Sequence, residues 1–304
     1  MATFRWFASI VLAATIVPTL PAEAHCPGSV ASVPLHLVNR HQMIVVISLN
    51  NSGPYDFLLD TGAQITMIDA SLATTLQLEI HGTAVVAGVG SQSDAAFSKV
   101  DRIAAGSHTV ANQKVLVYDF QKLKSANLQI QGILGEDFLE HFDVLIDNAN
   151  RLLCLDDYTN MRAAIHGSHI ALLAGASESG PEPLANSLIV SAHLSDAMRP
   201  VRLILDSGAN SPFLYNTSSY LALGLFRGAS WHGSGASGKT EAFMALPPQD
   251  VKIGSVELPR VLFVTLVSEQ KDSHTSEFDG LIPTGTFKRV FISHEDHFAV
   301  FDPW

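Results

Sequence analysis

The feature that most constrains the fold is a short stretch that occurs twice in the chain. The first copy is Phe57-Leu58-Leu59-Asp60-Thr61-Gly62-Ala63, and the second, 146 residues later, is Leu203-Ile204-Leu205-Asp206-Ser207-Gly208-Ala209. Each copy is typical of a buried apolar strand that ends in a carboxylate, a small hydroxyl residue, glycine and alanine. Because a lone charge is costly at the end of an apolar strand, the sequence predicts that Asp60 and Asp206 work as a pair.

The repeat continues on both sides of the two copies, with the elements in the same order. Each half is expected to have a leading strand and, after the shared motif, a short helix, a glycine-rich loop and a closing glycine-apolar segment. The matched pieces are the strands at 44–49 and 190–195, the helices at 70–76 and 218–223, the loops beginning at Gly88 and Gly233, and the segments beginning at Gly132 and Gly280. This repeat predicts two homologous lobes related by a pseudo-twofold axis, with the two aspartates facing each other across it.

The spacing of turn residues indicates the fold class. Short apolar segments are separated by Gly, Pro, Asn and Ser at intervals of about 8–12 residues, which favours an all-β architecture. Helix is expected only in short pieces, such as residues 136–142.

Residues 1–24 have the features of a secretory signal peptide. Arg5 supplies a basic start, an apolar run covers residues 6–17, and Ala22-Glu23-Ala24 fits a small-residue cleavage site. The run is shorter than the about 20 residues that a membrane span needs, so an uncleaved anchor is the less favoured alternative. We therefore expect a secreted or periplasmic protein with no membrane span after cleavage.

The remaining chain divides into three predicted parts. Residues 25–156 form an N-terminal lobe, residues 157–185 a linker, and residues 186–304 a C-terminal lobe. The linker contains a run rich in Gly, Ser and Pro at residues 175–183, a composition that suits a mobile connection. The chain is expected to act as a monomer.

Charge and cysteine content narrow the partners and the compartment. The formal net charge of −11 argues against nucleic acid or an anionic membrane as a partner, since both select basic surfaces. Cys26 and Cys154 are the two cysteines of the chain, and they could pair in an oxidising compartment. The sequence leaves that pairing open, because it does not show whether their geometry permits a disulfide.

Two carboxyl groups held side by side cannot both ionise cheaply, so they share one proton over a range of acidic pH. One carboxyl can then take a proton from water while the other donates to a carbonyl oxygen, which hydrolyses an amide without a covalent intermediate. Gly62 and Gly208 would allow close backbone approach and an amide hydrogen bond to a carboxylate. Thr61 and Ser207 could each form a hydrogen bond across to the other lobe.

These paired motifs resemble those of aspartic proteases of the pepsin and retropepsin type. The segments at 133–139 and 142–147 resemble the bacterial retropepsin-like branch in particular. The resemblance implies a bilobal pepsin-like acid protease fold of two pseudo-twofold-related β-barrel lobes, with a cleft between them for a peptide or protein substrate. It also implies that Asp60 and Asp206 are catalytic and that the hydroxyls of Thr61 and Ser207 hold the pair.

The chain departs from the pepsin pattern at several positions. Ala63 and Ala209 stand where pepsin-like enzymes usually have a serine that donates to the catalytic carboxylate. Loss of that donor should raise the pKa values of the pair, so we expect a pH optimum less acidic than that of pepsin. A pH–rate profile with its maximum at about pH 2 would refute this. Pro283 also stands where the first half has Gly135, so the packing behind Asp206 is expected to differ.

The candidate flap is the first glycine-rich loop. Its proposed residues are Gly88, Val89, Gly90 and Ser91, within a segment at 86–97 that lacks the tyrosine of pepsin-like flaps and is closer to a retropepsin flap.

Two further patterns are given little weight. Residues 233–240 satisfy the phosphate-loop pattern G-x-x-x-x-G-K-[ST], but they occupy the position of the first half's flap-like loop and are not followed by a long helix. The histidine pairs His166/His169 and His294/His297 lack the i, i+4 spacing of a zinc-binding helix. We therefore expect no cofactor and no metal.

The sequence thus predicts an exported aspartic endopeptidase. The alternative is a catalytically silent protease-like fold that binds peptides or proteins. Both aspartates are retained, which favours the enzyme.

Overall fold

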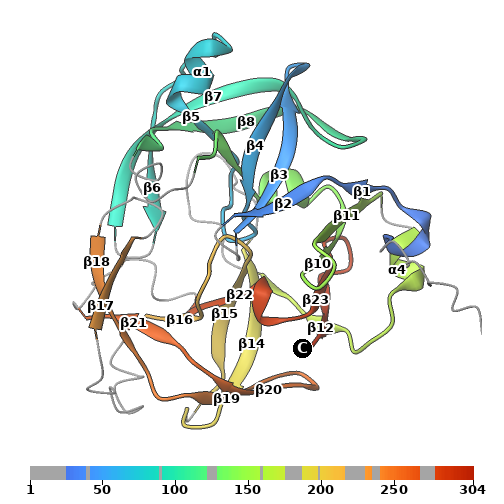
Figure 1. The fold of residues 1–304 in the computed structure, drawn as a ribbon, viewed down its shortest axis with the longest axis vertical. Coiled ribbons are helices and arrows are strands. Elements are labelled where there is room, and N and C mark those ends of the chain that lie inside the picture. The colour runs from blue at the N-terminus through green and yellow to red at the C-terminus, as the bar shows by residue number, and fades with distance from the viewer. Residues whose placement is uncertain are drawn as a thin grey trace, which may run out of the picture.

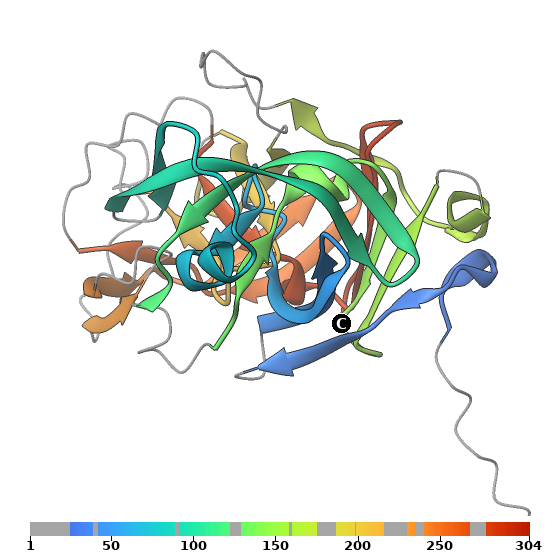
Figure 2. The same cartoon turned by 90° about the horizontal axis from the view of Figure 1, so that it is seen from above.

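The structure is a computed structural model that describes residues 25–38, 42–88, 91–121, 129–157, 160–174, 187–197, 199–215, 230–234, 240–267 and 278–304. These residues form mostly β-sheet with a few short helices, which confirms the predicted all-β class (Figures 1 and 2). The predicted signal peptide, the predicted helix at 218–223 and the Gly/Ser/Pro-rich run at 175–183 lie outside the described residues.

Most strands of the N-terminal half form one eight-stranded sheet, in the order β2-β3-β4-β9-β5-β8-β7-β6. The strand that precedes Asp60, β4, is an interior strand of this sheet, because it pairs with β3 on one side and with β9 on the other. The strands are β2 (Leu35–Val38), β3 (Gln42–Leu49), β4 (Ser52–Leu59), β5 (Met67–Asp69), β6 (Thr83–Gly88), β7 (Ser91–Ala105), β8 (His108–Tyr118) and β9 (Gly132–Leu134).

The C-terminal half forms a ten-stranded sheet with a related arrangement. Its main path is β17-β18-β21-β16-β22-β15-β14-β19-β20, and β13 pairs with β14. The strands are β13 (Leu173–Ala174), β14 (Leu188–Leu194), β15 (Val201–Asp206), β16 (Phe213–Leu214), β17 (Ser230–Ser234), β18 (Thr240–Ala245), β19 (Gln249–Ile253), β20 (Val256–Val261), β21 (Val264–Leu266) and β22 (Gly280–Pro283).

The third sheet joins the two halves. Its order, β1-β11-β10-β23-β24-β12, places strands from both halves side by side, and β10 pairs antiparallel with β23 (Figure 1). The halves are therefore connected by a continuous hydrogen-bonded sheet as well as by the chain between them. Its strands are β1 (Ser32–Val33), β10 (Asp143–Asp147), β11 (Leu152–Asp156), β12 (Ile170–Ala171), β23 (Arg289–Ser293) and β24 (Phe298–Asp302).

The described helices are short. The 3-10 helices are η1 (Pro27–Ser29) and η3 (Thr284–Thr286), and the α-helices are α1 (Ala70–Thr75), α3 (Glu136–Leu139) and α4 (Asn160–Ala164). Asp69 caps α1 by accepting a hydrogen bond from Ser71 N–H at 2.9 Å, which satisfies a donor of the first turn. Helices α1 and α3 lie where the sequence predicted helical segments, and no described helix is long and apolar enough to cross a membrane.

Part of the predicted linker is ordered by an ion-pair network. Residues 160–174, within the predicted linker, contain α4, β12 and β13. Arg162 on α4 binds Asp143 of β10, with Nε at 2.9 Å from Oδ2, and also binds Glu295 and Asp296 of the C-terminal half. The guanidinium thus fixes α4 to the third sheet, through contacts that composition does not reveal.

A disulfide bond joins Cys26 to Cys154, with Cα atoms 5.8 Å apart. The pairing that the sequence left open is therefore present in the structure. Cys154 lies on β11, so the bond attaches the beginning of the described chain to the third sheet.

The strands that lead to the two aspartates are buried on both faces. Phe57 and Leu59 of β4 are 0% exposed and pack into a core that also contains Leu203 and Leu205 of β15. The side chains between them point the other way, and Leu58 packs with Ile133 and Met67 in a second cluster. This burial explains why the stretches that contain the aspartates read as continuous apolar runs.

Candidate active site

The two aspartates lie at equivalent ends of β4 and β15. β4 pairs in parallel with β9, so that Leu59 faces Leu134, and β15 pairs in parallel with β22, so that Leu205 faces Ile282. Asp60 N–H donates to Leu134 O at 3.0 Å, which fixes the end of β4. Both carboxyl groups therefore follow strands that are held by the same kind of parallel pairing.

The hydroxyl residues after the aspartates bind each other's strands. Thr61 Oγ1 donates to Leu205 O at 2.7 Å and accepts from Ser207 N–H at 3.0 Å. Ser207 Oγ reciprocally donates to Leu59 O at 2.9 Å and accepts from Thr61 N–H at 3.0 Å. Both residues are buried. This reciprocal set joins the two halves directly beneath the carboxyl groups.

The carboxyl groups of Asp60 and Asp206 are close enough to affect each other's ionisation through charge and hydrogen bonding. Gly62 N–H donates to Asp60 Oδ1 at 2.9 Å. Asp206 Oδ1 accepts from the N–H groups of Gly208 and Ala209, each at 2.8 Å. The structure therefore brings the two carboxyl groups into one site and surrounds them with backbone donors.

The two glycines of the motifs allow this close approach. A Cβ atom on Gly62 would lie 2.7 Å from Asp206 Cγ, and a Cβ atom on Gly208 would lie 2.5 Å from Asp60 Cγ. Both distances are shorter than real Cβ atoms tolerate, so each glycine supports the carboxyl group of the opposite half.

Burial and mutual repulsion perturb the pair. Burial, followed by the charge of Asp206, raises the pKa of Asp60 well above its usual value. Burial also raises the pKa of Asp206, but the N–H groups of Ala209 and Gly208 and the hydrogen bond with Asp60 oppose that rise. Since both residues are partly exposed, the site can still be reached from solvent. The pair can therefore hold one proton in weakly acidic solution, with Asp60 as its preferred position.

Apolar side chains flank the pair in both halves. Ala63 packs against the cluster that contains Leu58, together with Val86 and Phe97 of the β6–β7 hairpin. Ala209 packs with Tyr215 and other residues of an equivalent cluster in the second half.

The candidate flap lies on a β-hairpin. β6 and β7 pair from Thr83 opposite Ala96 to Gly88 opposite Ser91, whereas Val89 and Gly90 lie outside the described residues. The second half has a comparable hairpin of β17 and β18, and Figure 1 shows both hairpins at the same side of the molecule. Residues 235–239 of the phosphate-loop pattern also lie outside the described residues.

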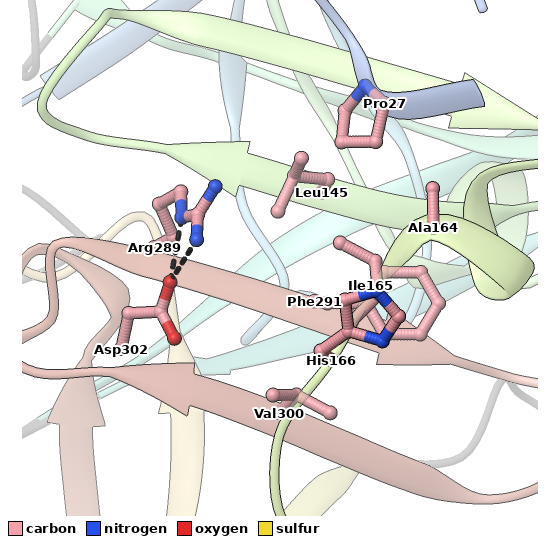
Figure 3. Close-up of a pocket in the computed structure, with 9 residues that line it drawn as sticks. All are labelled: Pro27, Leu145, Ala164, Ile165, His166, Arg289, Phe291, Val300 and Asp302. Atoms are coloured by element: carbon pink, nitrogen blue, oxygen red, sulfur yellow. Dashed lines mark hydrogen bonds and ion pairs between the residues drawn. The ribbon is translucent and has the colours of Figure 1, made fainter.

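An open pocket lies elsewhere, against the third sheet. Figure 3 shows Leu145, Phe291 and Val300 among the residues that line it and the ion pair of Arg289 with Asp302 at one end. It contains no residue of the Asp60–Asp206 site. Within the described ranges, no three His, Cys, Asp or Glu side chains are grouped so as to hold a metal ion.

Sequence reasoning missed two polar contacts behind Asp60. Thr66 N–H and Oγ1 donate to Asp137 Oδ1 at 2.8 and 2.6 Å. Glu136 Oε2 lies 2.8 Å from His294 Nε2. The only sequence signal was the acidic pair that follows Gly135, and nothing in the pattern pointed from it to His294.

Asp137 should make the fold less stable as the pH rises. Burial raises its pKa to about 6, although the two hydrogen bonds from Thr66 oppose the rise. Below the unfolded-state pKa of about 4, the carboxyl group is protonated in both states and the folded state keeps its full stability. As the pH rises to about 6, the free energy of unfolding falls by at most about 3 kcal/mol, because the unfolded state loses this proton first.

We therefore expect Asp137→Asn to raise the melting temperature by several degrees at about pH 8 and to have little effect at about pH 4. Thermal unfolding followed by circular dichroism at both pH values measures the difference. Asp94→Asn, at an exposed position on β7, is the matched control. Equal effects of Asp137→Asn at both pH values would show that the buried charge is not the cause.

Comparisons with known proteins find a matching family model and similar solved structures. Residues 45–138 match a family described as aspartyl protease. An aspartic proteinase from Irpex lacteus has a similar fold, with 11% sequence identity and a TM-score of 0.52 over 90% of this chain and 97% of that one. A retropepsin-like aspartic protease from Rickettsia conorii matches with 22% identity and a TM-score of 0.33, over 41% of this chain and 90% of that one. A search of curated proteins found no match.

Proposed function

Because the chain resembles the pepsin- and retropepsin-like aspartic proteases in sequence motif and in fold, we propose that it is an exported aspartic endopeptidase. Its substrates are extended peptide segments that bind between the two halves, and it acts as a monomer because one chain supplies both aspartates. Export rests on the signal-peptide features of residues 1–24. The observation that supports the activity most directly is the close pair of carboxyl groups above the reciprocal Thr61 and Ser207 contacts.

The proposed reaction uses one water molecule and one shared proton. The ionised carboxyl group takes a proton from the water as its oxygen attacks the peptide carbonyl carbon, and the protonated carboxyl group donates to the carbonyl oxygen. The carboxyl group that took the proton from water then gives it to the nitrogen, the other carboxyl group recovers a proton from a hydroxyl of the tetrahedral intermediate, and the C–N bond breaks. No covalent bond between enzyme and substrate is formed.

The hydrogen bonds favour a division of roles. Two backbone N–H groups at 2.8 Å stabilise negative charge on Asp206, which suits it as the base toward water. Asp60, with its strongly raised pKa, then carries the proton that is donated to the carbonyl oxygen.

Activity should be greatest in weakly acidic solution. The raised pKa of Asp60 keeps the pair singly protonated above the usual range of carboxyl groups, and activity is lost as the pH rises through that pKa. Cleavage of a denatured protein should be measured from about pH 3 to about pH 7, with and without a pepstatin-type inhibitor. We expect cleavage that the inhibitor blocks and that is fastest at a pH higher than the optimum of pepsin.

Two outcomes would contradict this proposal. A maximum near about pH 2 would refute the expected effect of Ala63 and Ala209 on the pair. Peptide binding without cleavage at any pH would instead favour a catalytically silent protease-like fold.

A further inference from the structure

We propose that Glu136 and His294 are positioning residues for Asp60. They form a proton-bridged pair that joins the two halves directly behind the loop that carries Asp60. This inference rests on the proposed function, since it takes Asp60 as a catalytic carboxyl group. The Glu136–His294 pair itself is defined by contacts between residues 158 positions apart in the chain.

Glu136 contacts the loop that follows Asp60. Glu136 N–H donates to Ala63 O at 2.8 Å. A Cβ atom on the preceding residue, Gly135, would also lie 2.8 Å from Ala63 O, so the start of α3 packs tightly against this loop. A displacement of Glu136 is therefore transmitted to Ala63, three residues after Asp60.

The Glu136–His294 contact also connects α3 to the other half. His294 lies in the turn between β23 and β24, its side chain is 8% exposed, and that of Glu136 is 1% exposed. His294 Nε2 lies 2.8 Å from Glu136 Oε2, and Nδ1 lies 2.7 Å from Phe142 O. The pair thus links α3 to the C-terminal half close to the third sheet.

The contact between Glu136 and His294 requires a proton. Both ring nitrogens face oxygen atoms, and Phe142 O can only accept, so Nδ1 carries a hydrogen. The contact between Nε2 and Oε2 then needs a second proton, on the imidazole or on the carboxyl group. Loss of that proton would place the nitrogen lone pair against a carboxylate oxygen, and the contact would open.

The electrostatic environment agrees with a proton held at this position. Burial lowers the pKa of His294, but the charge and hydrogen bond of Glu136 outweigh it and the net direction is upward. Burial raises the pKa of Glu136, against the opposing effect of His294. Both shifts favour the proton-bridged pair at acidic pH, and the pair is lost as the pH rises through the raised pKa of His294.

The neighbouring charged groups do not replace this proton. Glu140 raises the pKa values of both members. Glu295 and Asp296 follow His294 but bind Arg162. His141 and His108 also lie nearby, and their rings pack against Phe142 at centroid distances of 6.4 and 5.2 Å.

The described residues of the second half show no equivalent pair. At the position of Glu136 it has Thr284, which is buried with an Oγ1 atom that has no hydrogen-bond partner among the described residues. The proposed control therefore acts on the loop of Asp60 and not on that of Asp206.

The test follows the Asp60 loop and the histidine in the same NMR titration. In the wild type, we expect the amide chemical shifts of Gly62 and Ala63 to change with pH in a step. The midpoint of this step should equal the titration midpoint of the His294 imidazole. Glu136→Gln should move that midpoint to lower pH by about one unit or more, because burial remains while the opposing charge is removed. His294→Gln should remove the step and leave only the step caused by Asp60.

Kinetics provide the second readout. Besides the alkaline limb set by Asp60, kcat should show a partial decrease at the His294 midpoint, and this decrease should move with that midpoint in Glu136→Gln. KM for a peptide substrate should change little, as expected for a residue that positions a catalytic group. His297→Asn is the matched control, since His297 is an exposed histidine of the same turn. It should change neither the titration nor the rate profile. If His294→Gln does not fold, Glu136→Gln still decides the test, because the ring remains.

The outcomes separate this inference from the proposed function. Amides of Gly62 and Ala63 that do not respond to His294, or an unchanged midpoint in Glu136→Gln, would overturn the positioning role. A wild type that cleaves no substrate but shows the coupled titration would overturn the proposed function and support the pair.

Discussion

Asp60→Asn and Asp206→Asn are each expected to lower kcat/KM for peptide cleavage by at least about 10²–10⁴-fold. The reason is that the proposed reaction needs one ionised and one protonated carboxyl group, and an amide can neither take the proton from water nor release one to the carbonyl oxygen. Cleavage of a denatured protein at the optimal pH of the wild type measures the loss.

The same substitutions should not weaken the fold at neutral pH. Burial raises the pKa values of both carboxyl groups, so their ionisation at neutral pH costs stability that the neutral amide does not. A melting temperature at or above that of the wild type would separate lost chemistry from lost folding. Asp101→Asn, at an exposed position on β7, should change neither property. Cleavage that persists in both variants would show that the reaction occurs at another site or comes from a contaminant.

Gly208→Ala is expected to lower kcat by about 10²-fold or more without removing any catalytic atom. The new Cβ atom would lie 2.5 Å from Asp60 Cγ, so the carboxyl group must move away from its partner. A displacement of this kind disrupts the shared proton and the alignment with water. Gly62→Ala should act in the same way on Asp206, where the corresponding distance is 2.7 Å.

Gly285→Ala is the matched control for these variants. A Cβ atom on Gly285 would meet nothing within 4 Å, so the substitution should leave activity and melting temperature unchanged. Binding of a pepstatin-type inhibitor, measured by calorimetry, should weaken for Gly208→Ala and remain unchanged for Gly285→Ala. Full activity of Gly208→Ala would contradict the placement of the reaction at Asp60.

Much of the proposed site could be predicted from the sequence, because its parts are local and repeated. An apolar strand ending in Asp-Thr-Gly-Ala or Asp-Ser-Gly-Ala places a carboxylate at a strand end in either half. The two glycine-apolar segments then form the parallel neighbours of those strands, β9 and β22. Once the two halves are read as copies, the meeting of Asp60 and Asp206 follows from symmetry.

The predicted linker was harder to read, because composition reports only average tendencies. A Gly/Ser/Pro-rich run at 175–183 suggested mobility for the whole of 157–185. One charged side chain, Arg162, fixes α4 through Asp143 of the N-terminal half and Asp296 of the C-terminal half. Such contacts depend on where three distant segments meet.

Strand positions, turns and the paired motifs were thus encoded in local pattern, since hydrophobic periodicity reflects burial one segment at a time. The disulfide of Cys26 with Cys154, which closes a separation of 128 residues, and the Glu136–His294 contact were not. Both depend on the register in which β1, β10, β11 and β23 join the third sheet. The pairing of β1 with β11 and of β10 with β23 brings together segments that are distant in the chain, so no single stretch of the sequence contains it.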